Sequence, residues 1–224
     1  MGHLAYTKQA YKKLVEKLDS FPIGMVEDER TYNFLKKLYT EEEANIISKM
    51  PLKPSDIDSL QKYIHIEKNE LEEKMKNMAL KGIVASIDSN GKNYFAPMWA
   101  IPGFIEMTLM KVRDDIPQKE LAGLMHEMMK DKKFSMEVFS GETQFGRTLV
   151  DEKAAEDATD ILPYEIVTNA VNEAKKLAVV LCYCRHKQEH LGQSCYAPLE
   201  SCMAMNIGAD FMIKQGYGRE ISKK

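Results

Sequence analysis

The sequence predicts an α+β protein that is mostly α-helical. Apolar residues recur at helical spacing through much of the first hundred residues, and a β-hairpin signal closes that stretch. All four cysteines of the chain lie between residues 182 and 202, directly after a short apolar run. We therefore expect three parts: a helical region at 1–100, a helical middle segment at 101–150, and a smaller α/β cysteine-rich metal-binding domain at 151–224.

Three helices are expected in the first fifty residues. The first covers about 6–18, where apolar residues alternate with lysines at helical spacing: Tyr11, Leu14, Val15 and Leu18. The second covers about 30–39. Thr40 and Glu43 have the spacing of a capping box, which predicts a third, short helix that ends near Pro51.

Residues 54–97 show the order helix, turn, helix, hairpin. Ser55 is the expected N-cap of a short helix, and a longer helix at 67–81 ends at Gly82. Ser89-Asn90-Gly91 predicts a tight turn between strands at 83–87 and 92–96. This is the order of a winged helix, so the N-terminal domain is expected to be winged-helix-like. The helix at 67–81 carries four acids and four lysines, which favours packing or protein contact over DNA binding.

The middle of the chain changes in character. Residues 97–110 form a strongly apolar stretch that should pack inside, and helices are expected at 117–130 and 134–139. His126 is expected at the edge of the core. A strand is predicted at 145–150, and the acidic, alanine-rich stretch at 151–160 is the predicted domain boundary.

The last part is expected to run helix, strand, loop, helix. A helix at 162–176 precedes the apolar run at 177–181, which predicts a buried strand that ends at Cys182 and Cys184. A loop carries Cys195. The final helix is predicted at 198–215, with four inward-facing residues at every fourth position: Leu199, Met203, Ile207 and Phe211.

Four thiols within one short segment predict one metal centre with Cys182, Cys184, Cys195 and Cys202 as its ligands. Arg185 and His186 bring positive charge, which favours thiolates, and we expect them to donate hydrogen bonds to sulfur. Three alternatives remain open at this stage. His186 and His190 could join the ligands, the cysteines could be buried structural residues, or they could form two disulfides.

The cysteine segment resembles a family of anaerobe iron–sulfur proteins of the 4Fe–4S ferredoxin-type or dicluster-domain kind. The motifs that carry the resemblance are Cys182-Tyr183-Cys184-Arg185-His186, His190-Leu191-Gly192 with Cys195, Ala197-Pro198-Leu199 with Cys202, and Gly216-Tyr217-Gly218-Arg219 with Ile221-Ser222. The resemblance covers most of the chain and implies a 4Fe–4S cluster, with zinc as the alternative metal. It also implies electron transfer or a redox-linked role in an anaerobic organism, with a redox protein as partner. Family members usually continue into a cysteine-rich ferredoxin module, and the sequence contains no such cysteine run.

Composition and charge exclude several classes of function. The net charge of −3 gives no overall bias toward nucleic acid or anionic membranes, and no apolar run is long enough for a membrane helix. The sequence has no stretch of signal-peptide type, so we expect a cytoplasmic protein with reduced thiols. There is no phosphate loop, dinucleotide fingerprint or nucleophile elbow, and therefore no independent catalytic motif. The chain is compatible with a component of an oxidoreductase system.

Two other functions stay open, and the oligomeric state is not determined. One is a winged-helix DNA-binding regulator that responds to zinc or to an iron–sulfur cluster, which the front half would support. The other is an adaptor for protein partners whose metal site only holds the fold.

Overall fold

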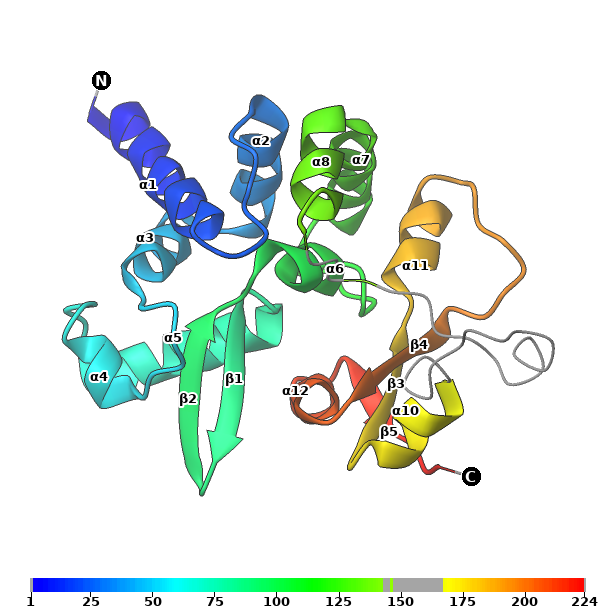
Figure 1. Ribbon diagram of the computed structural model, residues 1–224. Coiled ribbons are helices and arrows are strands. Elements are labelled where there is room, and N and C mark those ends of the chain that lie inside the picture. Colours follow the sequence, from blue (N-terminus) through cyan, green and yellow to red (C-terminus); the bar gives the residue numbers. More distant parts are fainter. Residues whose placement is uncertain (1, 143–145, 147–166, 224) are drawn as a thin grey trace.

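The computed structural model describes residues 2–142, 146 and 167–223, with side chains from residue 9 onward. As predicted, it is an α+β mixture dominated by helices (Figure 1). The predicted strand at 145–150, apart from residue 146, and the predicted boundary at 151–160 lie outside the described residues. Among the helices that the structure describes, none combines the length and the apolar character needed to span a bilayer.

Three N-terminal helices follow the predicted pattern: α1 (Gly2–Asp19), α2 (Glu29–Leu38) and α3 (Glu41–Lys49). The capping box at the start of α3 is confirmed. The Thr40 hydroxyl accepts from the Glu43 amide at 3.1 Å, and the Glu43 carboxylate accepts from the Thr40 amide at 2.7 Å. These reciprocal bonds satisfy two amides that a helix start otherwise leaves unpaired. Helix α1 packs against α3, and the Tyr11 hydroxyl donates to the Tyr39 carbonyl at 2.7 Å.

The predicted order helix, turn, helix, hairpin is confirmed for residues 54–97. It consists of α4 (Ile57–Gln61), α5 (Lys68–Lys81), β1 (Val84–Ser89) and β2 (Lys92–Pro97). Gly82 ends α5 with φ at +85°, a backbone conformation that favours glycine. Asn90 and Gly91 form the hairpin turn, also with positive φ.

The start of α4 differs from the prediction. Asp56, not Ser55, is the N-cap, because its carboxylate accepts from the Ser59 amide at 2.8 Å. Ser55 instead pairs with Phe95 of β2 in an antiparallel bridge, with N–O distances of 2.9 and 2.8 Å. A long-range backbone pairing therefore moved the cap by one residue, which local sequence alone does not reveal.

Residues 97–110 are largely buried, as predicted, and they join the two halves of the molecule. After an irregular turn at Ala100–Phe104, the short helix α6 (Ile105–Met107) lies at the centre of the molecule (Figure 1). Ile105 packs into the larger core beneath the N-terminal helices, whereas Met107 and Met110 pack into a smaller core with Val180 of the C-terminal sheet. Trp99 is the exception to the predicted burial, because it is 40% exposed.

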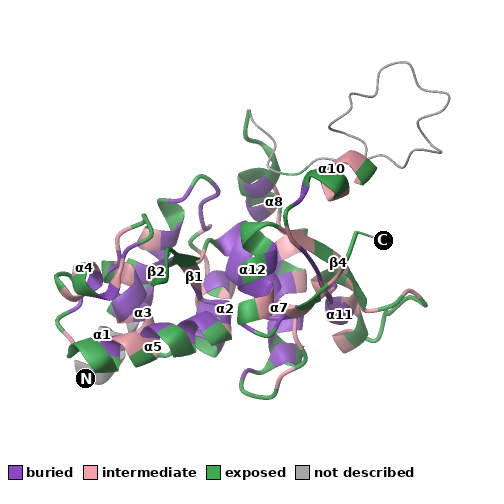
Figure 2. Cartoon of the chain, turned by 90° about the horizontal axis from the view of Figure 1, so that it is seen from below, coloured by how far each residue is buried: buried purple, intermediate pink, exposed green. Residues whose placement is uncertain are grey.

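The helices predicted after this segment are present as α7 (Gln118–Lys130) and α8 (Lys132–Phe139). His126 is half-buried on α7, at the edge of the core as expected. Of the helix predicted at 162–176, the structure describes α10 (Val167–Glu173), which buries none of its residues. In Figure 2 the residues of α10 have the colours of exposed and half-buried residues, in contrast to the purple, buried parts of α2 and α12.

The C-terminal part contains a three-stranded antiparallel sheet in the order β4-β3-β5 (Figure 1). The predicted buried strand is confirmed as β3 (Leu177–Leu181), which lies in the middle between β4 (Glu200–Met205) and β5 (Gly218–Glu220). Helix α12 (Ile207–Lys214) packs on this sheet and also contacts β1 of the hairpin.

Three predictions in this part are wrong. Residues 200–205 are a strand and not the start of a helix, since pairing with β3 overrides the helix-forming preference of Met and Ala. Phe211 is buried, but Met203 and Ile207 are 46% and 67% exposed, so they do not form the predicted inward stripe. The predicted loop after Cys184 is instead the helix α11 (Tyr183–His190), which packs against α7.

Candidate metal centre

Cys182 and Cys202 are brought together by the pairing of β3 with β4. Cys182 follows β3 directly, and its amide donates to the Leu199 carbonyl at 2.7 Å, which extends the pairing beyond the strand. The register shifts at this end: Val180 lies opposite Cys202, but the next residue of β3 lies opposite Glu200. The extra residue in β4 is a bulge, a feature that redirects neighbouring side chains. Cys202 therefore lies on a strand, and the predicted helix start at this position is corrected.

The two sulfurs form an asymmetric pair. The pKa of each thiol depends on the other, because the side chains of Cys182 and Cys202 interact. Cys182 is also the N-cap of α11, and the nearby backbone amides of Arg185 and Cys184 lower the pKa of its thiol. Helix N-termini favour negative charge in this way.

The two thiols have different pKa values. Burial opposes ionisation of Cys182, but the amides, the Cys202 thiol and the Arg185 charge outweigh it, so the pKa of Cys182 lies below its ordinary value. Burial, the interaction with the Cys182 side chain and the charge of that sulfur raise the pKa of Cys202 to about 11. Cys182 is thus the thiol that ionises more readily, and Cys202 is the one that keeps its proton more firmly.

Arg185 ties α11 to the segment that precedes β4. Its guanidinium donates to the Pro198 carbonyl at 2.8 Å and also to the Ser201 hydroxyl, next to the bulge. The hydrogen bonds recorded for the Arg185 guanidinium go to these two oxygens, and the expected bond to sulfur is not among them. The guanidinium acts on the Cys182 sulfur through its charge and holds the two chain segments together.

His186 points away from the sulfurs toward the middle segment. It is 4% exposed, and its Nδ1 lies 2.9 Å from the Leu109 carbonyl, to which a protonated Nδ1 donates. Its ring lies against the ring of His190, with centroids 4.6 Å apart. His186 and His190 share one face of a helix, as the sequence suggested. The hydrogen bond between His186 and the Leu109 carbonyl anchors α11 to the core.

Cys184 and Cys195 are both exposed. Cys184 lies close enough to Cys202 for its charge to raise the pKa of Cys202. Cys195 lies between α11 and β4. Within the described part of the chain, no group of three or more His, Cys, Asp or Glu side chains is placed to hold a metal ion. The structure therefore pairs two of the predicted ligands, puts Cys184 nearby, and does not group Cys195 with them.

The donor chemistry still fits a soft metal. Thiolates suit zinc and iron–sulfur clusters better than hard cations, and sulfur-bound metals need thiols that ionise readily. Cys182 meets that requirement through the two amides at the start of α11. Cys202 lies close to Cys182 because β4 pairs with β3, so both thiols can be offered to one centre.

Two residues next to this segment were missed by the sequence analysis. Tyr183 and Glu106 both line an apolar pocket of about 480 Å³, and burial, with a smaller contribution from the charge of Glu106, raises the pKa of Tyr183. A usable signal was present, because Glu106 is the one acidic residue within the apolar stretch from Trp99 to Met110.

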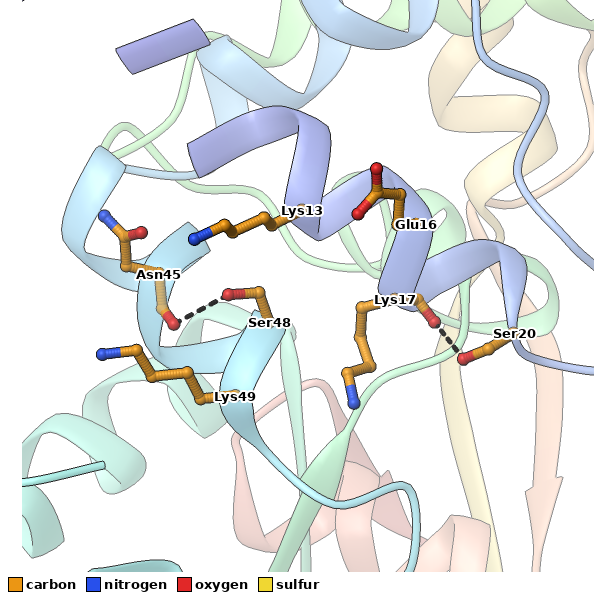
Figure 3. Close-up of a pocket in the computed structure, with 7 residues that line it drawn as sticks. All are labelled: Lys13, Glu16, Lys17, Ser20, Asn45, Ser48 and Lys49. Atoms are coloured by element: carbon orange, nitrogen blue, oxygen red, sulfur yellow. Dashed lines mark hydrogen bonds between the residues drawn. The ribbon is translucent and has the colours of Figure 1, made fainter. Parts of the chain in front are cut away.

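A different hollow, of about 410 Å³, lies between α1 and α3 and is lined by polar side chains (Figure 3). Three lysines reach toward it: Lys13, Lys17 and Lys49. The Lys17 ammonium already donates to the Met50 carbonyl at 2.8 Å. Because α1 and α3 lie on the opposite side of the molecule from α11 and β4 (Figure 1), this hollow is separate from the candidate centre.

Comparisons of this chain with protein-family models, with curated proteins and with solved structures find no match.

Proposed function

We propose that this chain binds a metal centre through the thiolates of Cys182, Cys184, Cys195 and Cys202, with a 4Fe–4S cluster as the favoured group and zinc as the alternative. The observation that carries the proposal is that the pairing of β3 with β4 brings Cys182, which follows β3, close to Cys202 of β4. The motifs around these cysteines, with their resemblance to anaerobe iron–sulfur proteins, favour the cluster.

The proposed role is electron transfer with a redox protein partner in the cytoplasm. When bound, a 4Fe–4S cluster supplies reversible one-electron chemistry, with a potential that depends on hydrogen bonds to sulfur and on solvent exposure. In this chain the amides of Cys184 and Arg185 stabilise negative charge on the Cys182 sulfur. The exposure of Cys184 and Cys195 leaves one side of the segment accessible to a partner.

Anaerobic purification followed by iron, acid-labile sulfide and zinc analysis tests this proposal. We expect iron and sulfide in equal amounts. We also expect the broad charge-transfer absorbance of such clusters, at about 400 nm. Zinc without sulfide would replace the cluster by the alternative metal. A chain that takes up neither group after reconstitution with iron and sulfide, or with zinc, would refute the proposal.

Serine variants of the cysteines then identify the ligands. Cys184→Ser and Cys202→Ser should lose the metal, because a hard hydroxyl is a poor substitute for a thiolate. Ser194→Ala changes an exposed hydroxyl beside Cys195 and serves as the matched control that keeps the metal. Retention of a full metal content by Cys202→Ser would show that the four-thiolate assignment is wrong.

A winged-helix DNA-binding regulator is the alternative, and the surface charges do not favour it. The assignment of the α4–β2 region to the winged-helix class is itself part of this proposal. The lysines of α5 form ion pairs with carboxylates: Lys68 with Asp58, Lys74 with Glu42 and Glu70, Lys76 with Glu72, and Lys81 with Glu43. A helix whose positive charges are already paired has little surplus to neutralise phosphates. A gel-shift assay against genomic fragments, with and without metal, would reveal salt-sensitive binding if the alternative holds.

A further inference from the structure

The apolar pocket of about 480 Å³ opens between α7, α8, the turn before α6 and the first residue of α11. Most of its wall is apolar, contributed by Ile101, Met129, Phe134, Val138 and Tyr183. Ser135 and Glu106 add polar groups to this wall. A pocket of this size with few polar groups is typical of a site for a small organic molecule.

Glu106 is the charged group of this pocket. Glu106 is only 8% exposed, and its Oε2 accepts a hydrogen bond from the Gly103 amide at 2.8 Å. Within the described residues, Glu106 forms no ion pair with a basic side chain. Lys187, whose ammonium donates to the sulfur of Met129 at 3.3 Å, does not reach it.

We propose that this pocket binds a small apolar molecule that carries one protonated amine, with Glu106 as the counter-ion of that amine. A carboxylate buried in apolar surroundings is costly unless it is paired. A ligand ammonium supplies the missing opposite charge, and the apolar walls bury the remainder of the ligand. The chemistry of the ligand thus follows from one buried carboxylate in an otherwise apolar wall.

The pocket adjoins the candidate metal centre but does not depend on it. Tyr183 links the two, because it lines the pocket and stands between Cys182 and Cys184 in the chain. A molecule in the pocket would therefore lie beside the cysteine segment. Ligand binding and metal binding are measured separately, so one proposal can fail without the other.

Calorimetric titration of the full chain at pH 8 with three probes of similar shape tests the proposal. The probes are 1-naphthylmethylamine, 1-naphthalenemethanol and 1-naphthoate, which are cationic, neutral and anionic. We expect saturable binding of the amine, at least tenfold tighter than the alcohol, and the weakest binding for naphthoate. Tighter binding of naphthoate than of the amine would identify Lys187 as the governing charge and would overturn the proposal.

Three variants locate the site. Glu106→Gln should weaken the amine at least tenfold and leave the alcohol within about twofold, because only the charge is removed. Ser135→Trp should block all three probes by filling the pocket. Glu127→Gln is the matched control, since it makes the same change on the exposed side of α7 and should leave all affinities unchanged.

Circular dichroism and thermal melting establish that each variant is folded. If Glu106→Gln does not fold, the comparison of the amine with the alcohol on the wild-type chain still decides the question. Absence of saturable amine binding to the wild-type chain, or equal amine affinity in folded Glu106→Gln, contradicts the proposal.

Discussion

Replacing Glu106 with Gln should change how the free energy of unfolding depends on pH. Glu106 is 8% exposed, and its carboxylate accepts from the Gly103 amide. Glutamine has nearly the same shape, and its side-chain oxygen can accept from the same amide. The substitution therefore removes the titration of this group while leaving its hydrogen bond in place.

The magnitude follows from the cost of burying the charge. Burial raises the pKa of Glu106 from its ordinary value of 4.5 to about 7, although the Gly103 amide opposes this. Below pH 4.5 the carboxyl is protonated in the folded and unfolded states alike, so the full stability of the folded state is present. As pH rises from 4.5 to 7, the unfolded chain has released a proton that the folded state still holds, and the free energy of unfolding falls. At about 1.4 kcal/mol per pH unit, this interval corresponds to a loss of about 3 kcal/mol, which levels off above pH 7.

Urea denaturation at several pH values between 4.5 and 8, followed by circular dichroism, measures this effect. The free energy of unfolding of Glu106→Gln minus that of the wild type should increase by about 3 kcal/mol across this range. Glu127→Gln, on the exposed side of α7, should follow the wild-type curve. Parallel curves for the wild type and Glu106→Gln would show that the carboxyl titrates at its ordinary pKa and that the reasoning is wrong.

Three further substitutions test other parts of the fold. Gly82→Ala should lower the free energy of unfolding by about 2 kcal/mol or more, because φ is +85° and a Cβ would lie 2.5 Å from the Tyr217 hydroxyl. Gly91→Ala is the control in the same urea assay, since Gly91 has φ at +75° but open space around it, so that only the backbone contribution is measured. Tyr217→Phe should cost about 1–2 kcal/mol in thermal melting, since the hydroxyl donates to a carbonyl at the end of α5 and accepts from a guanidinium; an unchanged melting temperature would show that these bonds contribute nothing. His186→Ala should lower the free energy of unfolding by about 2 kcal/mol through loss of the bond to Leu109, yet keep the metal content that cysteine-to-serine variants lose; metal loss in His186→Ala would favour a mixed Cys/His site.

Local signals in the sequence predicted most elements of the N-terminal part. Thr40 and Glu43 needed only each other to start α3, and Gly82 needed only its own conformational freedom to end α5. The run Leu177–Leu181 was predicted as a buried strand because its residues are wholly apolar and rich in valine. Each of these signals acts within a few residues, so a linear reading of the chain contains all the information required.

The cysteine segment shows where that reading stops. Residues 200–205 contain Met and Ala, which favour a helix, but the open edge of β3 pairs with them and makes them a strand. Residues 183–190 have no apolar stripe, yet they form a helix that is held by the hydrogen bond between His186 and the Leu109 carbonyl and by the contact of Lys187 with Met129 of α7. These partners lie about fifty to eighty residues earlier in the chain.

The sequence by itself determined which thiols are available, that they are concentrated in one segment, and that a buried strand leads into it. Only the tertiary structure decided which two thiols lie close together, which of them ionises more readily, and that a buried carboxylate lies in an apolar pocket beside Tyr183. The physical reason is that strand pairing, burial and the direction of backbone amides depend on segments distant in sequence. Residue identity specifies the chemical groups, whereas ionisation and contact depend on what the fold places around them.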